Sequence, residues 1–316
     1  MKKGERRTVL LKAPAKVNVI LRVLDRLPNG YHRLWSIMQT IDLMDTIRIS
    51  VDEEAQGISL HCKDPSAPKN QENLVYRAAD LILRKAGRTI GLDIELTKQI
   101  PMGAGLGGGS SDAAATIAGV VYVLGLKWSV PEMARLGAQL GSDVPFFFFG
   151  PTALVQGCGE DVRSISLVGE QWIVLIFPGF PIETKWAYER LAVSRGERLP
   201  LLSDHLVKLG TEQPLSWNAL LPWVKNDFEQ PLFAAFPCLK QIQEELLCAG
   251  ALKALVSGSG ATVFGVFPDE TTAKQAKQAL EGQSGRLVFA VKTCPPGERA
   301  IHPCSARTKQ GTLQTG

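Results

Sequence analysis

The sequence predicts an α+β fold built from two domains, and three observations support this prediction. The chain has 316 residues, a length that suits two domains or one large one. Stretches with strand-like alternation are mixed with stretches of helical spacing, without the regular strand–helix–strand order of a parallel α/β protein. A segment at residues 164–169 interrupts these patterned stretches and marks a boundary, and no internal repeat is visible.

The first hundred residues are expected to form mainly strands. Apolar and polar residues alternate there in several short stretches, as they do in strands with one buried face. Leucine, isoleucine and alanine at helical spacing then predict one helix, which Gly87 closes. The predicted strands are residues 17–23, 45–51, 56–61 and 90–97, and the predicted helix is residues 73–86.

The rest of the chain alternates less regularly between the two kinds of element. Ser129 has the character of a helix N-cap, with Pro131 and Glu132 in the first turn, and this helix is expected to run to Leu140. Residues 199–222 are expected to be irregular. Further strands are predicted at 153–155, 172–177, 255–256, 262–267 and 287–292, and further helices at 184–191, 227–249 and 270–282.

The most informative stretch runs from Pro101 to Ala115. Five glycines fall within the seven positions 103–109, and Ser110, Ser111 and Asp112 then lead into an alanine-rich helix that ends near Leu124. Glycine lets backbone amides converge on one point, and a helix N-terminus attracts anions through its unpaired N–H groups. The stretch therefore predicts a loop that binds the phosphates of a nucleotide.

Other interpretations of this loop fit less well. Residues 103–108 formally match G-x-G-x-x-G, but they do not lie in the first strand–helix turn, and no acidic residue follows about 20 positions later as in dinucleotide-binding units. A P-loop would require a lysine after Gly108 or Gly109. A tight turn without a ligand is disfavoured, because clustered glycines carry a conformational-entropy cost that a plain turn does not need.

Composition excludes several other classes of function. The chain is 45% hydrophobic and 21% charged, and its net charge of +4 is too small to indicate a nucleic-acid partner. The apolar runs are too short to span a bilayer, and the start of the chain does not resemble a secretory signal. Six cysteines without metal-binding spacing predict reduced, mostly buried thiols in a cytoplasmic protein.

Four other segments place polar residues at predicted turns or on one strand face. Each has an ordinary structural explanation by itself: a solvent-facing stripe, a packed turn, an aspartate that forms a turn, or a hairpin connection. Together with the glycine loop they favour phosphoryl transfer, in which Mg²⁺ neutralises the phosphates, an aspartate accepts the hydroxyl proton and a lysine stabilises developing charge. The segments are Lys16 with Asn18, Tyr31–His32, Ser142–Asp143 and Ser257–Thr262.

With these motifs, the sequence resembles the GHMP kinase superfamily from about Leu11 to Lys292. The superfamily motifs match residues 13–18, 101–113 and 257–262. Residues 29–32, 107–112 and 141–145 resemble the branch of the superfamily that acts on a cytidyl substrate more than they resemble mevalonate or homoserine kinases.

The resemblance implies an arrangement of domains. We expect the two-domain α+β GHMP kinase fold, with an N-terminal domain at 1–166, a C-terminal domain at 167–295 and the active site in the cleft between them. Residues 296–316 extend beyond the usual end of the family, and we expect them to be a disordered tail. The oligomeric state stays open between a monomer and a weak homodimer.

The resemblance also implies a reaction, the ATP-dependent phosphorylation of the 2-hydroxyl of 4-diphosphocytidyl-2-C-methyl-D-erythritol. Asp143 would take the hydroxyl proton, or mainly orient the hydroxyl, and Lys16 beside it would counter charge on the transferring phosphoryl group. Asn18 would bond the substrate. His32 would pair with the polar edge of cytosine.

Further substrate contacts follow from the same resemblance. Tyr31 would lie against the cytosine, and either Tyr188 or Trp186 would stack on its other face, although Tyr188 could equally be a core residue. Thr184 would contact the diphosphate of the substrate.

The cofactor implied is ATP with Mg²⁺. Ser110 and Ser111 could cap the helix, bind phosphate or ligate Mg²⁺, so the metal ligands remain open. Lys98 and Asn73 could reach the nucleotide or simply lie on the surface. The rivals that remain are another GHMP small-molecule kinase and a non-catalytic nucleotide sensor. The residues expected to bind ATP are Pro101, Met102, Gly103, Ala104, Gly105, Leu106, Gly107, Gly108, Gly109, Ser110, Ser111, Asn73 and Lys98.

Overall fold

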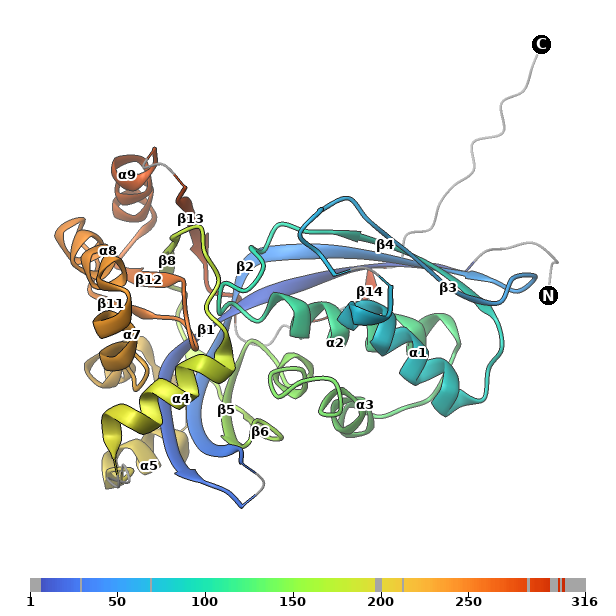
Figure 1. The fold of residues 1–316 in the computed structure, drawn as a ribbon, viewed down its shortest axis with the longest axis horizontal. Coiled ribbons are helices and arrows are strands. Elements are labelled where there is room, and N and C mark those ends of the chain that lie inside the picture. The colour runs from blue at the N-terminus through green and yellow to red at the C-terminus, as the bar shows by residue number, and fades with distance from the viewer. Residues whose placement is uncertain are drawn as a thin grey trace, which may run out of the picture.

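The computed structural model describes residues 7–28, 30–68, 70–196, 201–211, 213–282, 285–295, 301 and 303–304. Two long antiparallel strands, β1 (Thr8–Arg26) and β2 (His32–Asp52), form its central feature. They run from the first half of the molecule to the edge of the second, where they end in a hairpin (Figure 1). The sequence predicted only short strands here, because apolar residues at mixed spacing hid the continuity of β2 across residues 34–51.

Each half of β2 pairs with a different strand. Residues 46–52 pair with β4 (Gly91–Thr97), and residues 34–39 pair with β5 (Thr152–Gly157). The edge strands β3 (Gly57–Cys62) and β6 (Asp161–Ser164) complete this part of the sheet, with β3 parallel to β4 and β6 antiparallel to β5.

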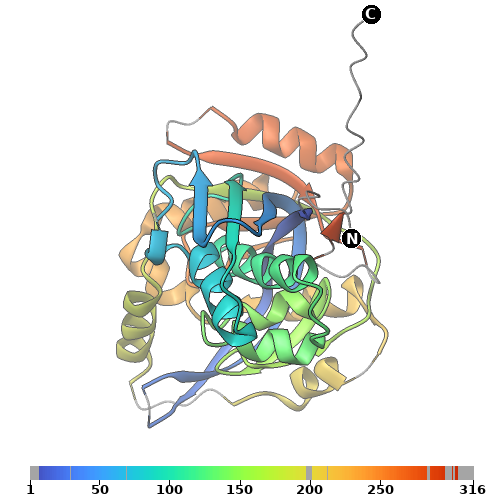
Figure 2. The ribbon, with the colours of Figure 1, turned by 90° about the vertical axis from the view of Figure 1, so that its right-hand side faces the viewer.

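Helices cover one face of this sheet, as Figures 1 and 2 show. The central one is α2 (Gly108–Val123), whose buried Ala113, Ala114 and Ala115 allow it to lie close to the strands. Asn73 caps α1 by accepting a hydrogen bond from the Val75 amide at 2.9 Å. The helical elements of this half are η1 (Asn70–Glu72), α1 (Leu74–Ala86), α2, α3 (Val130–Gly137) and η2 (Pro145–Phe148).

The second half contains a four-stranded antiparallel sheet in the order β11-β12-β8-β13. Its strands are β8 (Trp172–Phe177), β11 (Lys253–Val256), β12 (Val263–Phe267) and β13 (Leu287–Lys292). Figure 1 shows α8 and α9 on the outer side of this half and α4 beside the hairpin of β1 and β2. The main helices are α4 (Thr184–Arg195), α7 (Glu229–Ala235), α8 (Pro237–Cys248) and α9 (Glu270–Leu280).

The segment between β8 and α7 contains more regular structure than predicted. Residues 199–222 were expected to be irregular, but α5 and α6 form within them because apolar residues such as Leu206 and Leu220 pack into a buried cluster. The short elements of this region and its neighbour are β7 (Leu167–Val168), α5 (Asp204–Thr211), β9 (Leu215–Ser216), α6 (Trp217–Leu220), η3 (Leu221–Trp223) and β10 (Lys225–Asn226).

Strands from the second half of the chain return to the first sheet. β10 pairs in parallel with residues 20–21 of β1, and β14 (Pro303–Cys304) pairs with residues 10–11. Ile301 is buried at 7% exposure. The predicted tail, 296–316, lies largely outside the described residues, but at these three positions the chain is part of the fold, which the sequence did not predict. The proposed division at residue 166 stays a prediction.

Two smaller observations bear on the composition-based expectations. Among the described residues, none of the helices combines the length and the apolar character that crossing a bilayer requires. The cysteines expected to be mostly buried are more accessible than that, since Cys62, Cys158 and Cys238 are half-buried and Cys248 is exposed.

Candidate active site

The glycine loop lies between β4 and α2, and it is held from two sides. On one side, the Lys16 amide of β1 donates to Leu106 O at 2.9 Å. On the other, the Ser257 hydroxyl donates to Gly105 O at 3.0 Å, and the amide of Thr262 donates to Ala104 O at 3.2 Å. The predicted glycine loop and the predicted second glycine-serine turn are therefore in direct backbone contact.

Gly105 explains why this contact needs glycine. Its φ is +77°, and a Cβ at this position would lie 2.4 Å from Ser257 O and 2.6 Å from Gly260 O. Any other residue would therefore push the two loops apart.

The N-terminus of α2 is open to an anion. Its N-cap is Gly107, with φ +70°, which supplies no side chain to pair with the first amides of the helix. A Cβ there would meet Lys16 Cγ at 2.9 Å, so the glycine lets the lysine stem cross the helix end. Unpaired amides and the positive end of a helix dipole next to a lysine make a suitable phosphate site.

The two residues expected to be catalytic are brought together across the fold. Lys16 Nζ on β1 lies 3.2 Å from Asp143 Oδ2, which follows α3. The lysine side chain is 4% exposed and the aspartate 27% exposed. The pair thus joins a sheltered cation to a carboxylate that solvent or a substrate can reach.

Asn18, expected to contact the substrate, uses its amide to fix the lysine. Lys16 Nζ donates to Asn18 Oδ1 at 2.6 Å, and Asn18 Nδ2 donates to Ser36 Oγ at 2.9 Å. Ser36 in turn donates to Ile20 O at 2.7 Å. This buried chain of bonds orients the ammonium group toward Asp143, and Ser36 is a contributor that sequence reasoning missed.

A cavity of about 300 Å³ opens above this pair. It is lined from both halves of the molecule, which agrees with the expected cleft location. The first half contributes Lys16, Asn18, Gly105, Gly107, Ser110 and Asp143, and the second half contributes Thr184, Tyr188, Phe228, Gly258 and Ser259.

An aromatic wall borders the cavity. The rings of His32 and Tyr188 are stacked with centroids 5.0 Å apart, and Phe228 meets Tyr188 edge-on at 4.9 Å. Trp186, the other stacking candidate, instead packs against Phe236. Of the two, Tyr188 is the residue that lines the cavity.

His32 and Tyr188 are both uncharged at neutral pH, so the aromatic wall suits recognition by neutral hydrogen bonds. Burial, together with the nearby cations of Arg26 and Arg195, lowers the pKa of His32, so its imidazole is neutral at pH 7 and offers one donor and one acceptor. Burial also raises the pKa of Tyr188 to about 12, which keeps the phenol neutral.

The two other residues predicted to contact the substrate are Thr184, at the edge of the cavity, and Tyr31, beside it. Thr184 Oγ1 lies 3.1 Å from Ser259 Oγ and closes the cavity between α4 and the 257–262 turn. Tyr31 is 65% exposed and lines a neighbouring hollow with Ser142 and Cys158 rather than the cavity above Lys16.

The two residues least certain to bind ATP have structural partners. Asn73 is the N-cap of α1, and its Nδ2 donates to Pro68 O at 2.8 Å. Lys98 forms a buried ion-pair cluster with Asp45 and with Asp112, whose Oδ2 lies 2.7 Å from Lys98 Nζ. Their contact with a nucleotide stays a prediction.

This lysine-aspartate cluster braces the phosphate loop from behind. Asp45 accepts hydrogen bonds from the amides of Gln99 and Ile100, just before the loop, at 2.6 and 2.9 Å. Burial raises the pKa of Asp112 to about 7 despite the opposing effect of Lys98. Sequence reasoning did not identify Asp45, because a buried carboxylate on a strand carries no local signal.

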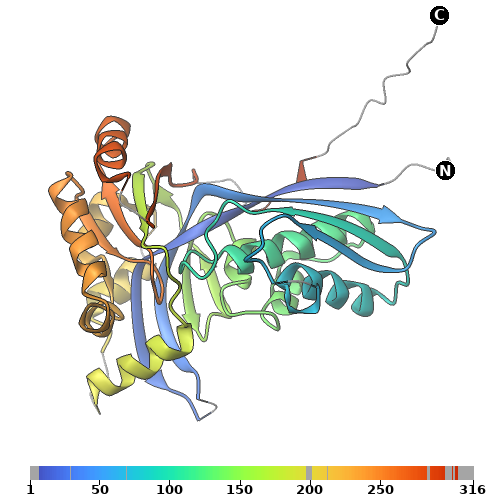
Figure 3. The ribbon, with the colours of Figure 1, turned by 45° about the horizontal axis from the view of Figure 1, so that its top comes forward.

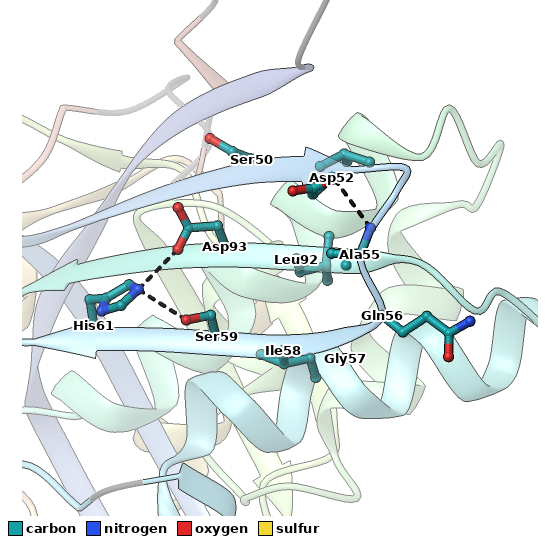
Figure 4. A pocket seen from close by; sticks show the side chains of 12 residues that line it. Ser50, Asp52, Ala55, Gln56, Gly57, Ile58, Ser59, His61, Leu92 and Asp93 are labelled. Atoms are coloured by element: carbon teal, nitrogen blue, oxygen red, sulfur yellow. Dashed lines mark hydrogen bonds and ion pairs between the residues drawn. The ribbon is translucent and has the colours of Figure 1, made fainter. Parts of the chain in front are cut away.

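A larger hollow of about 450 Å³ lies elsewhere, over β2, β3 and β4 (Figure 4). It contains Ser59, His61 and Asp93, the residue types of a nucleophilic triad. However, His61 Nε2 makes both contacts, at 3.0 Å to Ser59 Oγ and 3.2 Å to Asp93 Oδ1, whereas a triad uses the two ring nitrogens separately. With His61 64% exposed, this group is a surface cluster and not a catalytic relay.

Comparison with known proteins agrees with this geometry. A family model described as "GHMP kinases N terminal domain" matches residues 73–151, and one described as "GHMP kinases C terminal" matches residues 208–286. The chain belongs to the GHMP kinases. The family predicted from the sequence motifs and its α+β fold are therefore confirmed, and the protein is an ATP-dependent small-molecule kinase.

Individual GHMP kinases resemble the chain along most of its length. A protein of Geobacter metallireducens named 4-diphosphocytidyl-2-C-methyl-D-erythritol kinase is 41% identical over 289 residues, covering 90% of this chain and 99% of its own. A crystal structure of 4-(cytidine 5'-diphospho)-2C-methyl-D-erythritol kinase is 32% identical, with a TM-score of 0.71 over 92% of this chain and 99% of its own. Homoserine kinase from Cytophaga hutchinsonii, at 19% identity and a TM-score of 0.71 over 96% of this chain and 99% of its own, shares the fold.

Proposed function

We propose that this kinase transfers the γ-phosphoryl group of ATP to the 2-hydroxyl of 4-diphosphocytidyl-2-C-methyl-D-erythritol, in the non-mevalonate route to isoprenoid precursors. The products are ADP and the 2-phosphate. The observation that carries the proposal is the Lys16–Asp143 pair, 3.2 Å apart below a cavity lined by the phosphate loop and by Tyr188. Relatives at about 40% identity over 90% of the chain carry the name of this activity.

The residues of the pair have complementary roles. The acceptor hydroxyl would lie against Asp143, which takes its proton as the new O–P bond forms and the bond from the γ-phosphorus to the β-phosphate oxygen breaks. Lys16 would counter the negative charge on the transferring group. Its bond to Asn18 and its low exposure hold the ammonium in place before the substrate arrives, so little reorganisation is needed.

The residue types present fit magnesium that arrives with ATP. Magnesium in kinases is usually held by one or two protein oxygens together with nucleotide phosphates and water. Ser110 supplies a hydroxyl on the cavity beside the phosphate loop, and we propose that it would contact the ion. When bound, Mg²⁺ would neutralise phosphate charge. Among the described residues, no group of three His, Cys, Asp or Glu side chains could hold an ion without a nucleotide.

The cytidyl end of the acceptor would lie at the aromatic wall. His32, neutral at pH 7, can pair with the polar edge of cytosine, and Tyr188 offers a ring to the base, whereas Tyr31 would reach the base from the neighbouring hollow. Thr184 lines the same cavity as Tyr188, Lys16 and Asp143, and we propose that its hydroxyl contacts the diphosphate that joins cytidine to the polyol. We place the enzyme in the cytoplasm, where unpaired thiols such as those of Cys62, Cys158 and Cys238 stay reduced.

The direct test is an ADP-release assay with purified protein, Mg·ATP and 4-diphosphocytidyl-2-C-methyl-D-erythritol, run beside mevalonate and homoserine. We expect turnover only with the cytidyl substrate. Turnover with another alcohol would keep the kinase chemistry and overturn the substrate. Binding of ATP without any turnover would instead support a nucleotide sensor.

A further inference from the structure

The short segment Asn226–Glu229 meets three separate parts of the active site. Asn226 Nδ2 donates to the carbonyls of Val256 and Gly258, at 2.7 Å each, and so holds the glycine-serine turn that faces the phosphate loop. Phe228 is 1% exposed and packs edge-on against Tyr188. The segment looks in sequence like the start of a helix, yet its side chains contact elements far from it along the chain.

Asp227 makes the most connected contacts of the segment. Its carboxylate is 5% exposed and lies 2.6 Å from Arg195 Nη2 and 3.1 Å from Arg22 Nε. It also accepts a hydrogen bond from the Val23 amide at 2.9 Å. One carboxylate therefore joins β1 to the last turn of α4.

The arginine on α4 reinforces the same junction. Arg195 Nη1 donates to Val23 O at 2.5 Å, so this side chain binds both the aspartate and the strand. The amide of Asp227 itself donates to Leu21 O at 3.0 Å. Figures 1 and 3 show α4 lying beside the hairpin end of β1 and β2, where these contacts are made.

The position of α4 matters because α4 and the hairpin provide opposite members of the aromatic wall. Tyr188 and Thr184 lie on α4, whereas His32 begins β2. The stack between His32 and Tyr188 therefore crosses the junction that Asp227 holds. A shift of α4 along the hairpin would separate these rings and move Thr184 away from the cavity, but it would leave the phosphate loop in place, because that loop is held by β1 and by the 257–262 turn.

We propose that Asp227 is a positioning residue for the acceptor: through Arg22 and Arg195 it holds α4 against the β1–β2 hairpin in the arrangement that receives the cytidyl substrate. This inference rests on the proposed function for the identity of the acceptor. Asp227 should affect the binding of the acceptor and not that of ATP, because its contacts reach the acceptor wall and not the loop that binds ATP.

The test compares Asp227→Asn with a matched control, Glu245→Gln. Asparagine keeps the size of the side chain and can still accept the Val23 amide, but it removes the charge that both arginines share. Glu245, 20% exposed, pairs with Arg286 at 2.6 Å in a partly buried ion pair between α8 and the residue before β13, away from the cavity. We expect Asp227→Asn to raise the KM for the acceptor about ten-fold while changing the KM for ATP less than about two-fold, and Glu245→Gln to change neither.

A second measurement follows the stack directly. In wild-type protein, the His32 ring protons should show a ring-current shift in NMR spectra from Tyr188, and His32→Gln assigns the signal. Asp227→Asn should move this signal toward its unstacked position, and Glu245→Gln should not. If Asp227→Asn does not fold, Arg195→Gln makes the same comparison, because Arg22 still pairs with the carboxylate.

The outcomes separate this inference from the proposed function. The inference would be overturned if Asp227→Asn and Glu245→Gln lowered the melting temperature equally while the KM for the acceptor and the His32 signal stayed unchanged. Asp227 would then be purely structural. A wild-type enzyme that does not turn over the cytidyl substrate would overturn the proposed function, and the His32 signal would then decide whether Asp227 positions α4.

Discussion

Replacing Asp143 by asparagine tests the centre of the mechanism. The substitution keeps the shape of the side chain but removes the charge that lies 3.2 Å from Lys16 Nζ. At an effective dielectric of about 20, two unit charges at this distance attract by roughly 5 kcal/mol, an upper limit because Asp143 is partly open to solvent. The lysine keeps its bond to Asn18, so we expect the variant to fold.

The expected effect on turnover follows from the loss of the proton acceptor. A positioned general base typically contributes about 10²–10⁴ in rate, which corresponds to roughly 3–5 kcal/mol of transition-state stabilisation. Asp143→Asn should therefore lower kcat by about this factor and leave ATP binding within about two-fold of wild type, because the phosphate loop does not depend on Asp143. The measurements are an ADP-release assay for kcat and a fluorescence titration with a labelled nucleotide for binding.

A suitable control is Asp93→Asn, which makes the same chemical change at a partly exposed side chain of β4, away from the cavity. It should retain full turnover. If Asp143→Asn kept more than about one third of the wild-type kcat, Asp143 would only orient the hydroxyl and the base would have to be sought elsewhere. A large loss of ATP affinity would instead mean that the phosphate loop depends on this carboxylate.

Three further predictions concern the loop and its supports. Gly105→Ala should raise the KM for ATP at least about ten-fold, since its Cβ would lie 2.4 Å from a carbonyl of the facing turn. Gly87→Ala is the control for backbone strain, because its φ is also positive, at +60°, but no atom lies within 4 Å of the added Cβ, and it should leave this KM unchanged. Burial raises the pKa of Glu229 to about 7, so ionisation of this side chain lowers the free energy of unfolding as pH rises from about 4.5 through 7. The Glu229→Gln variant should therefore exceed the wild type in free energy of unfolding by up to about 3 kcal/mol at pH 8 and by little at pH 4.5, as measured by urea unfolding. Lys98→Met should lower the free energy of unfolding by about 3–5 kcal/mol, because it leaves two buried carboxylates without their cation. Adding Asp112→Asn should recover part of this loss. A change in the KM for ATP without a loss of stability would show that Lys98 contacts the nucleotide instead.

The parts of the site that depend on neighbouring residues could be predicted from the sequence. Five glycines before a serine-rich helix start are a local pattern, and the structure places that pattern at an uncapped helix N-terminus beside Lys16. The spacing of Lys16 and Asn18 likewise placed both on one strand face, where they share a hydrogen bond. Signals of this kind survive because a few neighbouring residues determine the backbone that displays them.

The parts that could not be predicted depend on contacts between distant residues. Asp45 and Lys98 are 53 positions apart, and Asp227 and Arg22 are 205 apart, so no spacing rule connects them. The choice between Tyr188 and Trp186 also failed to follow from sequence, because both aromatic residues lie within two positions of each other on the same helix. Tertiary packing turns Trp186 toward Phe236 and Tyr188 toward His32, which places Tyr188 on the cavity, and its contact with cytosine stays a prediction.

The contact between the two glycine-containing segments explains why the site lies where the halves of the molecule meet. Gly105 and the turn at 257–262 approach so closely that neither loop could move without the other, and Asn226 fixes that turn from behind. The phosphate loop is thus bound to the second half of the chain by the Thr262 amide and the Ser257 hydroxyl, while the acceptor wall is bound to it by the side chains of Asp227 and Arg195. We therefore expect loss of the Ser257 hydroxyl to raise mainly the KM for ATP and loss of the Asp227 charge to raise mainly the KM for the acceptor, so the two KM values will distinguish these effects.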